Sequence, residues 1–120
     1  MGGGTVETGT GLLGLLGDVT VQSGASAING KLELYQTNRT FYAAPGGTLT
    51  INASIIEAAG SAGILKTGPG AVILSGSNTF TGPVVVSAGY LTLENDLALA
   101  HSGGLIVTNI GIVQLSDQDQ

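Results

Sequence analysis

A five-residue pattern, Gly-x-[Leu/Val]-x-[Leu/Ile], recurs along the chain and limits its fold more than any other feature. The copies are GKLEL (30–34), GTLTI (47–51), GAVIL (70–74), GYLTL (89–93) and GIVQL (111–115). Their opening glycines lie 17, 23, 19 and 22 residues apart. A period of about 20 residues is the signature of a solenoid, in which each repeat buries its apolar face by stacking on its neighbours.

Within each copy, apolar residues alternate with others, which is the pattern of a strand that buries one face. The side chains expected to point inward are Leu32 and Leu34, Leu49 and Ile51, Val72 and Leu74, Leu91 and Leu93, and Val113 and Leu115. A glycine before each strand permits a tight corner where a Cβ atom would clash. These glycines are Gly30, Gly47, Gly70, Gly89 and Gly111.

A second short apolar run precedes most copies: VTV (19–21), ILK (64–66), VVV (84–86) and LIV (105–107). Turn-forming stretches such as APGG (44–47) and TGPG (67–70) separate the runs, and no helix-length segment has a 3.6-residue period. The sequence therefore predicts an all-β parallel β-helix, or β-solenoid, of about five to six rungs. A β-sandwich ranks second, because its hairpins favour Asn-Gly turns and the chain has only Asn29-Gly30.

Composition agrees with one such domain and excludes several classes of function. The 120 residues include 21 glycines, 42% hydrophobic residues and only 9% charged residues. The net charge is −5 and the only basic residues are Lys31, Arg39 and Lys66, so no basic stripe exists for nucleic acid. The lack of cysteine excludes disulfides and zinc–thiolate sites. No apolar run approaches the ~18–20 residues of a membrane-spanning helix.

Three segments are expected along the chain. Residues 1–17 are rich in glycine and leucine and are predicted to form an N-terminal cap or a lead-in to the solenoid. They have no basic region of the kind that opens a signal peptide. The solenoid is expected to span residues 18–115, and residues 116–120 are predicted to form an acidic tail.

Residues 64–95, ILKTGPGAVILSGSNTFTGPVVVSAGYLTLEN, closely resemble the passenger-associated transport repeat, also called the autotransporter-associated β-strand repeat. The residues that match the repeat are Lys66, Gly68, Gly70, Leu74, Ser75, Gly76, Asn78, Thr79, Gly82, Val86, Gly89 and Leu91. Phe80 stands where tyrosine is usual, Val72 replaces a leucine, and Pro83-Val84 replaces a polar pair. Residues 37–51 and 96–115 look like degenerate copies.

The resemblance implies a right-handed parallel β-helix at the surface of a Gram-negative bacterium or secreted from it. In that family the solenoid is usually the stalk of a passenger, and its folding outside the cell is thought to help draw the chain out. The sequence contains neither a translocator β-barrel nor an export signal. We therefore expect either a fragment of such a passenger or a separate short solenoid.

Two glycine-rich stretches are reminiscent of phosphate-binding loops. Residues 9–14 spell GxGxxG, but a nucleotide site needs that motif between a strand and a helix, and here another strand is expected. In GSAGILKT (60–67), Leu65 stands where a P-loop requires glycine. We expect Lys66 to be a solvated residue at the end of a strand.

The titratable residues do not form a predicted catalytic or metal site. His101 is expected in a surface turn, and the acidic residues Glu33, Glu57, Glu94 and Asp96 are scattered over the repeat. Residues 117–120, DQDQ, lack the glycine and the distal glutamate of a calcium loop. The sequence thus predicts no enzyme activity and no cofactor or metal.

The remaining polar residues are expected to be structural. Asn38 and Asn78 both precede Thr or Arg-Thr and then Phe in what look like comparable rungs, so Asn78 and Phe80 are expected to stack on counterparts along the axis. An ice-binding face would need threonine at matched outward positions, but only Thr50 and Thr92 occupy the middle of the five copies.

Two functions of different kinds remain. The first is a passive stalk in a surface or secreted passenger. The second is a self-assembling filament subunit, or an adhesin module that binds a host-surface or glycan ligand. The ends of a β-helix present unpaired backbone groups, and the leucines at 12, 13, 15 and 16 are expected to cover the first rung or to pair with another subunit. Such head-to-tail contacts would produce filaments.

Overall fold

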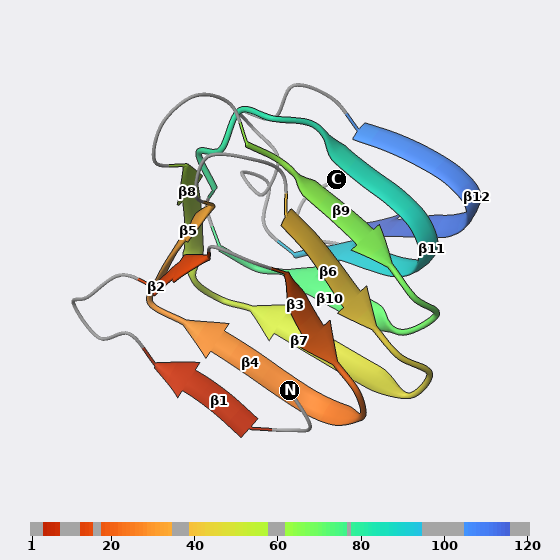
Figure 1. Ribbon diagram of the computed structural model, residues 1–120, viewed down its shortest axis with the longest axis horizontal. Coiled ribbons are helices and arrows are strands. Elements are labelled where there is room, and N and C mark those ends of the chain that lie inside the picture. The colour runs from red at the N-terminus through yellow and green to blue at the C-terminus, as the bar shows by residue number, and fades with distance from the viewer. Residues whose placement is uncertain are drawn as a thin grey trace.

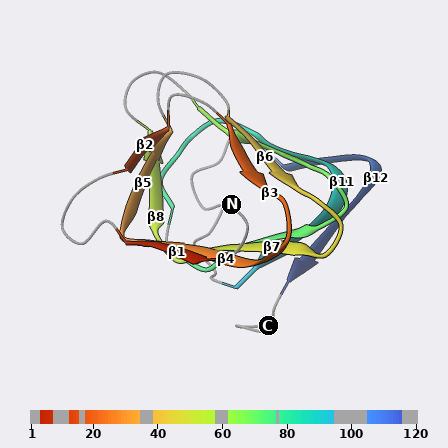
Figure 2. The ribbon, with the colours of Figure 1, turned by 60° about the horizontal axis from the view of Figure 1, so that its bottom comes forward.

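The chain winds into a β-solenoid, a stack of coils in which every pair of neighbouring strands is parallel (Figure 1). The computed structural model describes residues 4–7, 13–15, 18–34, 39–57, 62–76, 78–94 and 105–115. The described strands lie on three sides of the stack (Figure 2). Among the described residues no helix is long and apolar enough to cross a membrane. The all-β parallel architecture expected from the repeat is confirmed.

Strands from successive coils stack on each side. The first side contains β1 (Gly4–Glu7), β4 (Gly24–Asn29), β7 (Gly47–Ile51), β10 (Ala71–Leu74) and the second halves of β11 (Val84–Leu93) and β12 (Leu105–Leu115). The second side contains β3 (Val19–Val21), β6 (Arg39–Ala43), β9 (Ile64–Thr67) and the first halves of β11 and β12. Since β11 continues around the corner, these two sides form one 9-stranded sheet.

The third side is shorter. It contains β2 (Leu13–Leu15), β5 (Lys31–Leu34) and β8 (Ser54–Glu57). We number the coils from the N-terminus: coil 1 (4–21), coil 2 (24–43), coil 3 (47–67), coil 4 (71–86), coil 5 (90–107) and the start of coil 6 (111–115).

Among the described residues, three coils carry a strand on all three sides, which is fewer than the five to six rungs expected. In coil 4, the described residues between β10 and β11 form no strand. The third side of coil 5 falls within residues 95–104, outside the described part of the chain. The apolar period marks strands well on the first side, where Leu49, Val72 and Leu91 align in register. The same period does not predict whether a coil also has a strand on its third side.

The five copies of the glycine pattern do not all occupy the same side. The last four stack on the first side as β7, β10, β11 and β12. The first copy, GKLEL, is instead β5 on the third side, where Leu32 aligns with Leu13 and Ile55. Its glycine precedes the next by only 17 residues, whereas register partners on the first side lie 19 to 23 residues apart. A spacing shorter than a full turn places GKLEL on another face.

Aliphatic side chains and two phenylalanines fill the interior. The buried core residues include Leu32, Leu34, Leu49, Ile51, Val72, Leu74, Phe80 and Leu91. Leu93 and Val113 are partly buried and pack against this core, as does Leu13 from the N-terminal segment. The side chain of Leu115 lies outside the described part. Each coil therefore adds one layer to a continuous apolar column.

Alternation within β11 gives a direct test of these faces. Leu91 is 0% exposed, whereas its neighbour Thr92 points outward and is partly exposed. We expect Leu91→Asp to unfold the solenoid, because an unpaired carboxylate would enter a dry interior. Thr92→Asp should change the free energy of unfolding by less than ~1 kcal/mol. Thermal unfolding of both variants checks this, and equal losses would contradict the assignment of inward and outward faces.

Candidate functional site

Lys66 is the most unusual side chain in the described structure because it is charged and fully buried. It lies in β9 and aligns with Phe41 of β6 and Val86 of β11, both of which point inward. Lys66 is 0% exposed, as these two neighbours are. The expectation that it would be a solvated strand-end residue is therefore wrong. Its aliphatic stem occupies a position in an otherwise apolar column.

The ammonium group of Lys66 donates hydrogen bonds to three backbone carbonyls. The Nζ atom lies 2.8 Å from the carbonyl oxygen of Thr67 and 2.8 Å from that of Gly68, both in the corner between coils 3 and 4. The third acceptor, 3.1 Å away, is the carbonyl oxygen of Ala88 in the corner between coils 4 and 5. An ammonium has three N–H donors, so this arrangement uses all of them. Lys66 thereby joins two successive corners.

Burial also changes the acid–base properties of this lysine. Loss of hydration disfavours the charged form and lowers the pKa of Lys66 from 10.5 to about 8. At pH 7 the side chain is still mostly protonated, which is the state that matches three carbonyl acceptors.

Glycines leave room for the contact of Lys66 with the two corners, which we call the lysine joint. Gly89 has a φ of 71°, and a Cβ atom there would lie 2.3 Å from the carbonyl oxygens of Gly68 and Gly70 and 2.8 Å from Lys66 Nζ. At Gly70, a Cβ atom would lie 2.4 Å from the carbonyl oxygens of Ala44 and Gly47. These corners stack so closely that no side chain fits between them. Of the other predicted glycines, Gly30 has a φ of 104°, and a Cβ atom at Gly111 would meet Val86.

On the third side of coil 4, Asn78 replaces a missing strand contact. Its Oδ1 atom accepts a hydrogen bond from the backbone N–H of Ile55 at 2.8 Å, and the N–H of Thr79 donates to the carbonyl of Ile55 at 2.9 Å. Asn78 is 2% exposed and Phe80, at 1%, packs in the core. The side-chain amide therefore continues the ladder from β8 to a segment that has no strand of its own.

The expected stack of Asn78 on Asn38 rests on a wrong equivalence. Residues 39–43 form β6 on the second side, whereas residues 78 and 79 contact β8 on the third. Asn38 itself lies outside the described residues. The hydrogen bond that Asn78 Oδ1 accepts comes from the backbone N–H of Ile55 in β8.

A polar ladder that the sequence reasoning missed lies at another corner. Asn52 Nδ2 donates to Asn29 Oδ1 at 2.7 Å, and the hydroxyl of Ser75 donates to Asn52 Oδ1. Each residue directly follows the last inward side chain of its first-side strand, which is Ile28, Ile51 or Leu74. Polar residues at the same position of three successive coils were the available signal.

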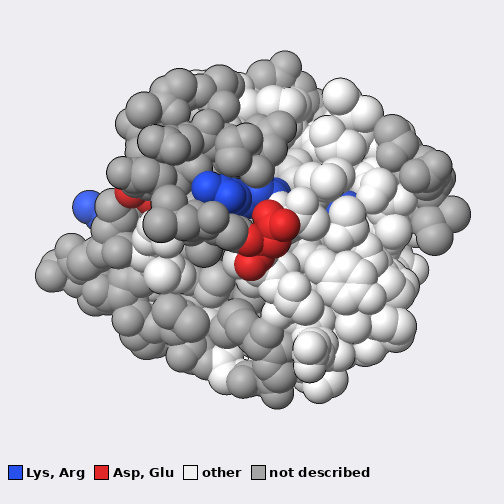
Figure 3. All heavy atoms as spheres, in the orientation of Figure 1, with Lys and Arg blue, Asp and Glu red and all other residues white. Residues whose placement is uncertain are grey.

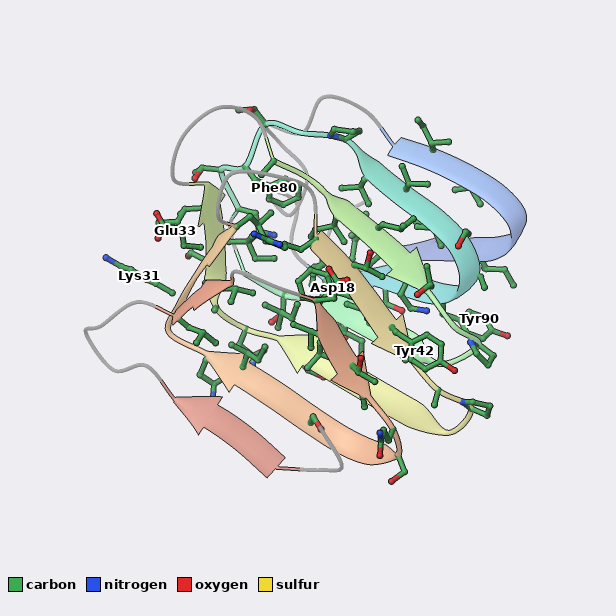
Figure 4. All side chains as sticks on the ribbon, viewed as in Figure 1. Asp18, Lys31, Glu33, Tyr42, Phe80 and Tyr90 are labelled. Carbon is green, nitrogen blue, oxygen red and sulfur yellow. The ribbon has the colours of Figure 1, made fainter. Side chains whose placement is uncertain are left out.

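The described charged side chains do not converge on a catalytic or metal-binding arrangement. Figure 3 shows few of them on the viewed face, and in Figure 4 Lys31 and Glu33 lie on the side away from Tyr42 and Tyr90. In the described part of the chain, no three His, Cys, Asp or Glu residues group to hold a metal ion. His101, residues 9–12 of the GxGxxG stretch and the acidic tail lie outside that part.

Taken together, these features define a parallel β-helix whose coils are joined by a buried lysine, close-packed glycines and an asparagine that extends the ladder. Comparison with known families identifies the segment that carries the joint: residues 64–93 match the passenger-associated-transport-repeat. The resemblance seen in the sequence is thus confirmed.

The chain is also similar to the adhesin BmaC autotransporter of Brucella suis biovar 1 (strain 1330). The two are 30% identical over 111 residues, which cover 85% of this chain and 3% of the relative. The chain thus spans a small fraction of that relative's length. No solved structure matches it.

The matched segment is longer than one coil, so its first strand stacks on a later part of the same segment. It begins in β9, passes through coil 4 and ends in β11 at Leu93. Lys66 near its start and Ala88 near its end are 22 residues apart in sequence, yet they are hydrogen-bonded. One repeat therefore contains both halves of the lysine joint.

Two glycines with similar backbone conformations separate the effect of close packing from that of backbone strain. Gly46 has a φ of 79°, but a Cβ atom there would have no other atom within 4 Å, unlike one at Gly89. We expect Gly46→Ala to cost only the left-handed backbone strain, about 1–2 kcal/mol. Gly89→Ala should lose clearly more, because its Cβ atom also meets two carbonyls and the ammonium. Urea unfolding measures both, and equal losses would contradict the close packing of the corners.

The pH dependence of stability tests the burial of Lys66. The pKa of about 8 in the folded chain lies below the ordinary value of 10.5, so between these values the unfolded chain binds more protons. The contribution of Lys66 to the free energy of unfolding should therefore rise with pH across this window, by up to ~1.4 kcal/mol per pH unit. It should level off as the pH falls below about 8, because Lys66 is then protonated in both states.

This contribution is obtained by comparing urea unfolding of the natural chain with that of Lys66→Met from pH 7 to 10.5. The two chains share every other titrating group. The stability of the natural chain relative to the variant should increase above pH 8, and a difference that stays flat would show that the ammonium remains hydrated.

Proposed function

We propose that this chain is a non-catalytic structural segment of a bacterial surface or secreted passenger, where it acts as a stalk and aids secretion by folding coil upon coil. The single observation that carries the proposal is how the repeat uses its polar residues. Lys66, Ser75 and Asn78 are all engaged in joining coils. A segment whose polar groups serve stacking is suited to support rather than to chemistry.

The C-terminal end of the described solenoid supports addition of further coils. Val107 aligns with the buried Val86 but is itself 47% exposed. Another coil stacked on β12 would bury the inward side chains as β12 buries those of β11. The much greater length of the autotransporter relative is consistent with such continuation.

Surface display tests the role in secretion. The 120-residue chain is placed between an N-terminal epitope and an autotransporter translocator, and exposure of the epitope on intact cells is followed over time. If folding outside the cell helps to draw the chain out, Leu91→Asp should slow the appearance of the epitope several-fold. Thr92→Asp, which leaves the core intact, serves as the control and should behave like the natural chain. Equal rates for all three chains would overturn the proposed aid to secretion.

An adhesive or self-associating surface is the second candidate, favoured by exposed apolar residues. Tyr42 and Tyr90, 39% and 40% exposed, flank the stacked corners between the second and first sides and lie on the same side of the view in Figure 4, and the relative is named an adhesin. If copies of this chain associate head to tail through β12 or pair through these corners, cells displaying it should clump. Cells that display the folded chain and remain dispersed would leave the stalk as the better account.

A further inference from the structure

Apolar packing alone specifies the stacking of these coils weakly. The inward residues of successive first-side strands, such as Leu49, Val72 and Leu91, are all buried aliphatic side chains in register. A shift by two residues would still present apolar side chains to the interior, since inward and outward positions alternate with a period of two. Such strands need another device to select one register.

Lys66 breaks this uniformity in the second-side column. Its neighbours in the column, Phe41 and Val86, are apolar, and Lys66 is the one charged residue among the buried side chains of the described structure. A buried ammonium without enough acceptors carries a large desolvation penalty. The stability of a given register therefore depends on which carbonyls it brings to the Nζ atom.

The native register is the one that completes the acceptor set. Two acceptors, the carbonyls of Thr67 and Gly68, belong to the same corner as the lysine and would follow it in any register. The third, from Ala88, comes from the next corner. A slip of β11 by two residues along β9 would displace that carbonyl by roughly 6.6 Å, well beyond hydrogen-bonding distance.

We propose that Lys66 determines the register in which coil 4 stacks on coil 3, because a slipped arrangement would leave its buried ammonium one carbonyl short. Lys66 is thus a positioning residue for folding. The proposal is independent of what the folded solenoid does for the cell.

Disulfide trapping can read the register directly, because the chain has no cysteine. Leu65 and Val85 are outward-facing register partners in β9 and β11. Cysteines at these two positions would be about 4.8 Å apart across the ladder, within reach of a disulfide. Cysteines at Thr67 and Val85 would be about 8 Å apart in the native register, too far to bridge, and would come together after a two-residue slip.

Each cysteine pair is refolded from denaturant under reducing conditions and then oxidised. With Lys66 present, only the Leu65→Cys/Val85→Cys pair should form a disulfide. With Lys66→Met, the ratio of slipped to native disulfide should rise on the order of 100-fold or more, the factor expected when the penalty for an uncompensated buried charge no longer opposes the slip. Ile64→Met is the matched control, because Ile64 lies in the same strand and is 2% exposed. This variant should form only the disulfide of the native register.

Lys66→Gln provides a second variant, since its amide keeps two N–H donors without the charge. A chain that folds with the native pair alone after both substitutions would overturn the proposal. Loss of folding in both variants would overturn it too, because Lys66 would then supply stability rather than choice of register.

Discussion

The close approach of backbone to backbone at the corners is the constraint on which the rest of the structure depends. Parallel coils stack at the spacing of a β-ladder, so where the chain turns, the carbonyls of one corner lie directly against the next. A Cβ atom at Gly70 or Gly89 would lie only 2.3 to 2.4 Å from carbonyl oxygens of neighbouring corners. The high glycine content follows from this geometry. It also creates carbonyl groups that turn out of the ladder and need another donor.

Lys66 meets that need from inside the solenoid. Water could serve such carbonyls only if the interior were open, but the side chains around the lysine stem are fully buried. An ammonium on a long aliphatic stem combines an apolar surface for the column with three donors for the corner. Asn78 solves a related problem on the third side, where its amide oxygen accepts the N–H of Ile55 that no strand satisfies. In both places a side chain completes backbone pairing.

The strands and their inward faces could be predicted from sequence because they depend on a local period. Leu32 and Leu34 are buried as the alternation indicates, although they lie on a different side from the other copies. The side that a strand occupies depends on the number of residues in a full coil. That number cannot be inferred from the sequence of any single strand. The burial of Lys66 could not be inferred from its own neighbourhood either, because two of its acceptors are backbone atoms of a corner and the third comes 22 residues later in the chain. Similarly, the motifs around Asn38 and Asn78 look alike in sequence but fall at different points of the coil.

The partners of the repeat explain how it can stack on coils that match the family poorly. Lys66 finds its acceptors within the repeat itself. The contacts of Asn78 and Ser75 with the preceding coil include the backbone N–H of Ile55 and the backbone carbonyl of Ile51. Backbone groups are present whatever the side chains are. Apart from the bond of the Ser75 hydroxyl to the Asn52 side chain, these contacts therefore require little of the preceding sequence beyond an inward apolar residue at the matching position. A segment built in this way needs no second intact repeat beside it. This agrees with a chain in which residues 64–93 match the family, while the flanking strands keep the opening glycine and the apolar alternation.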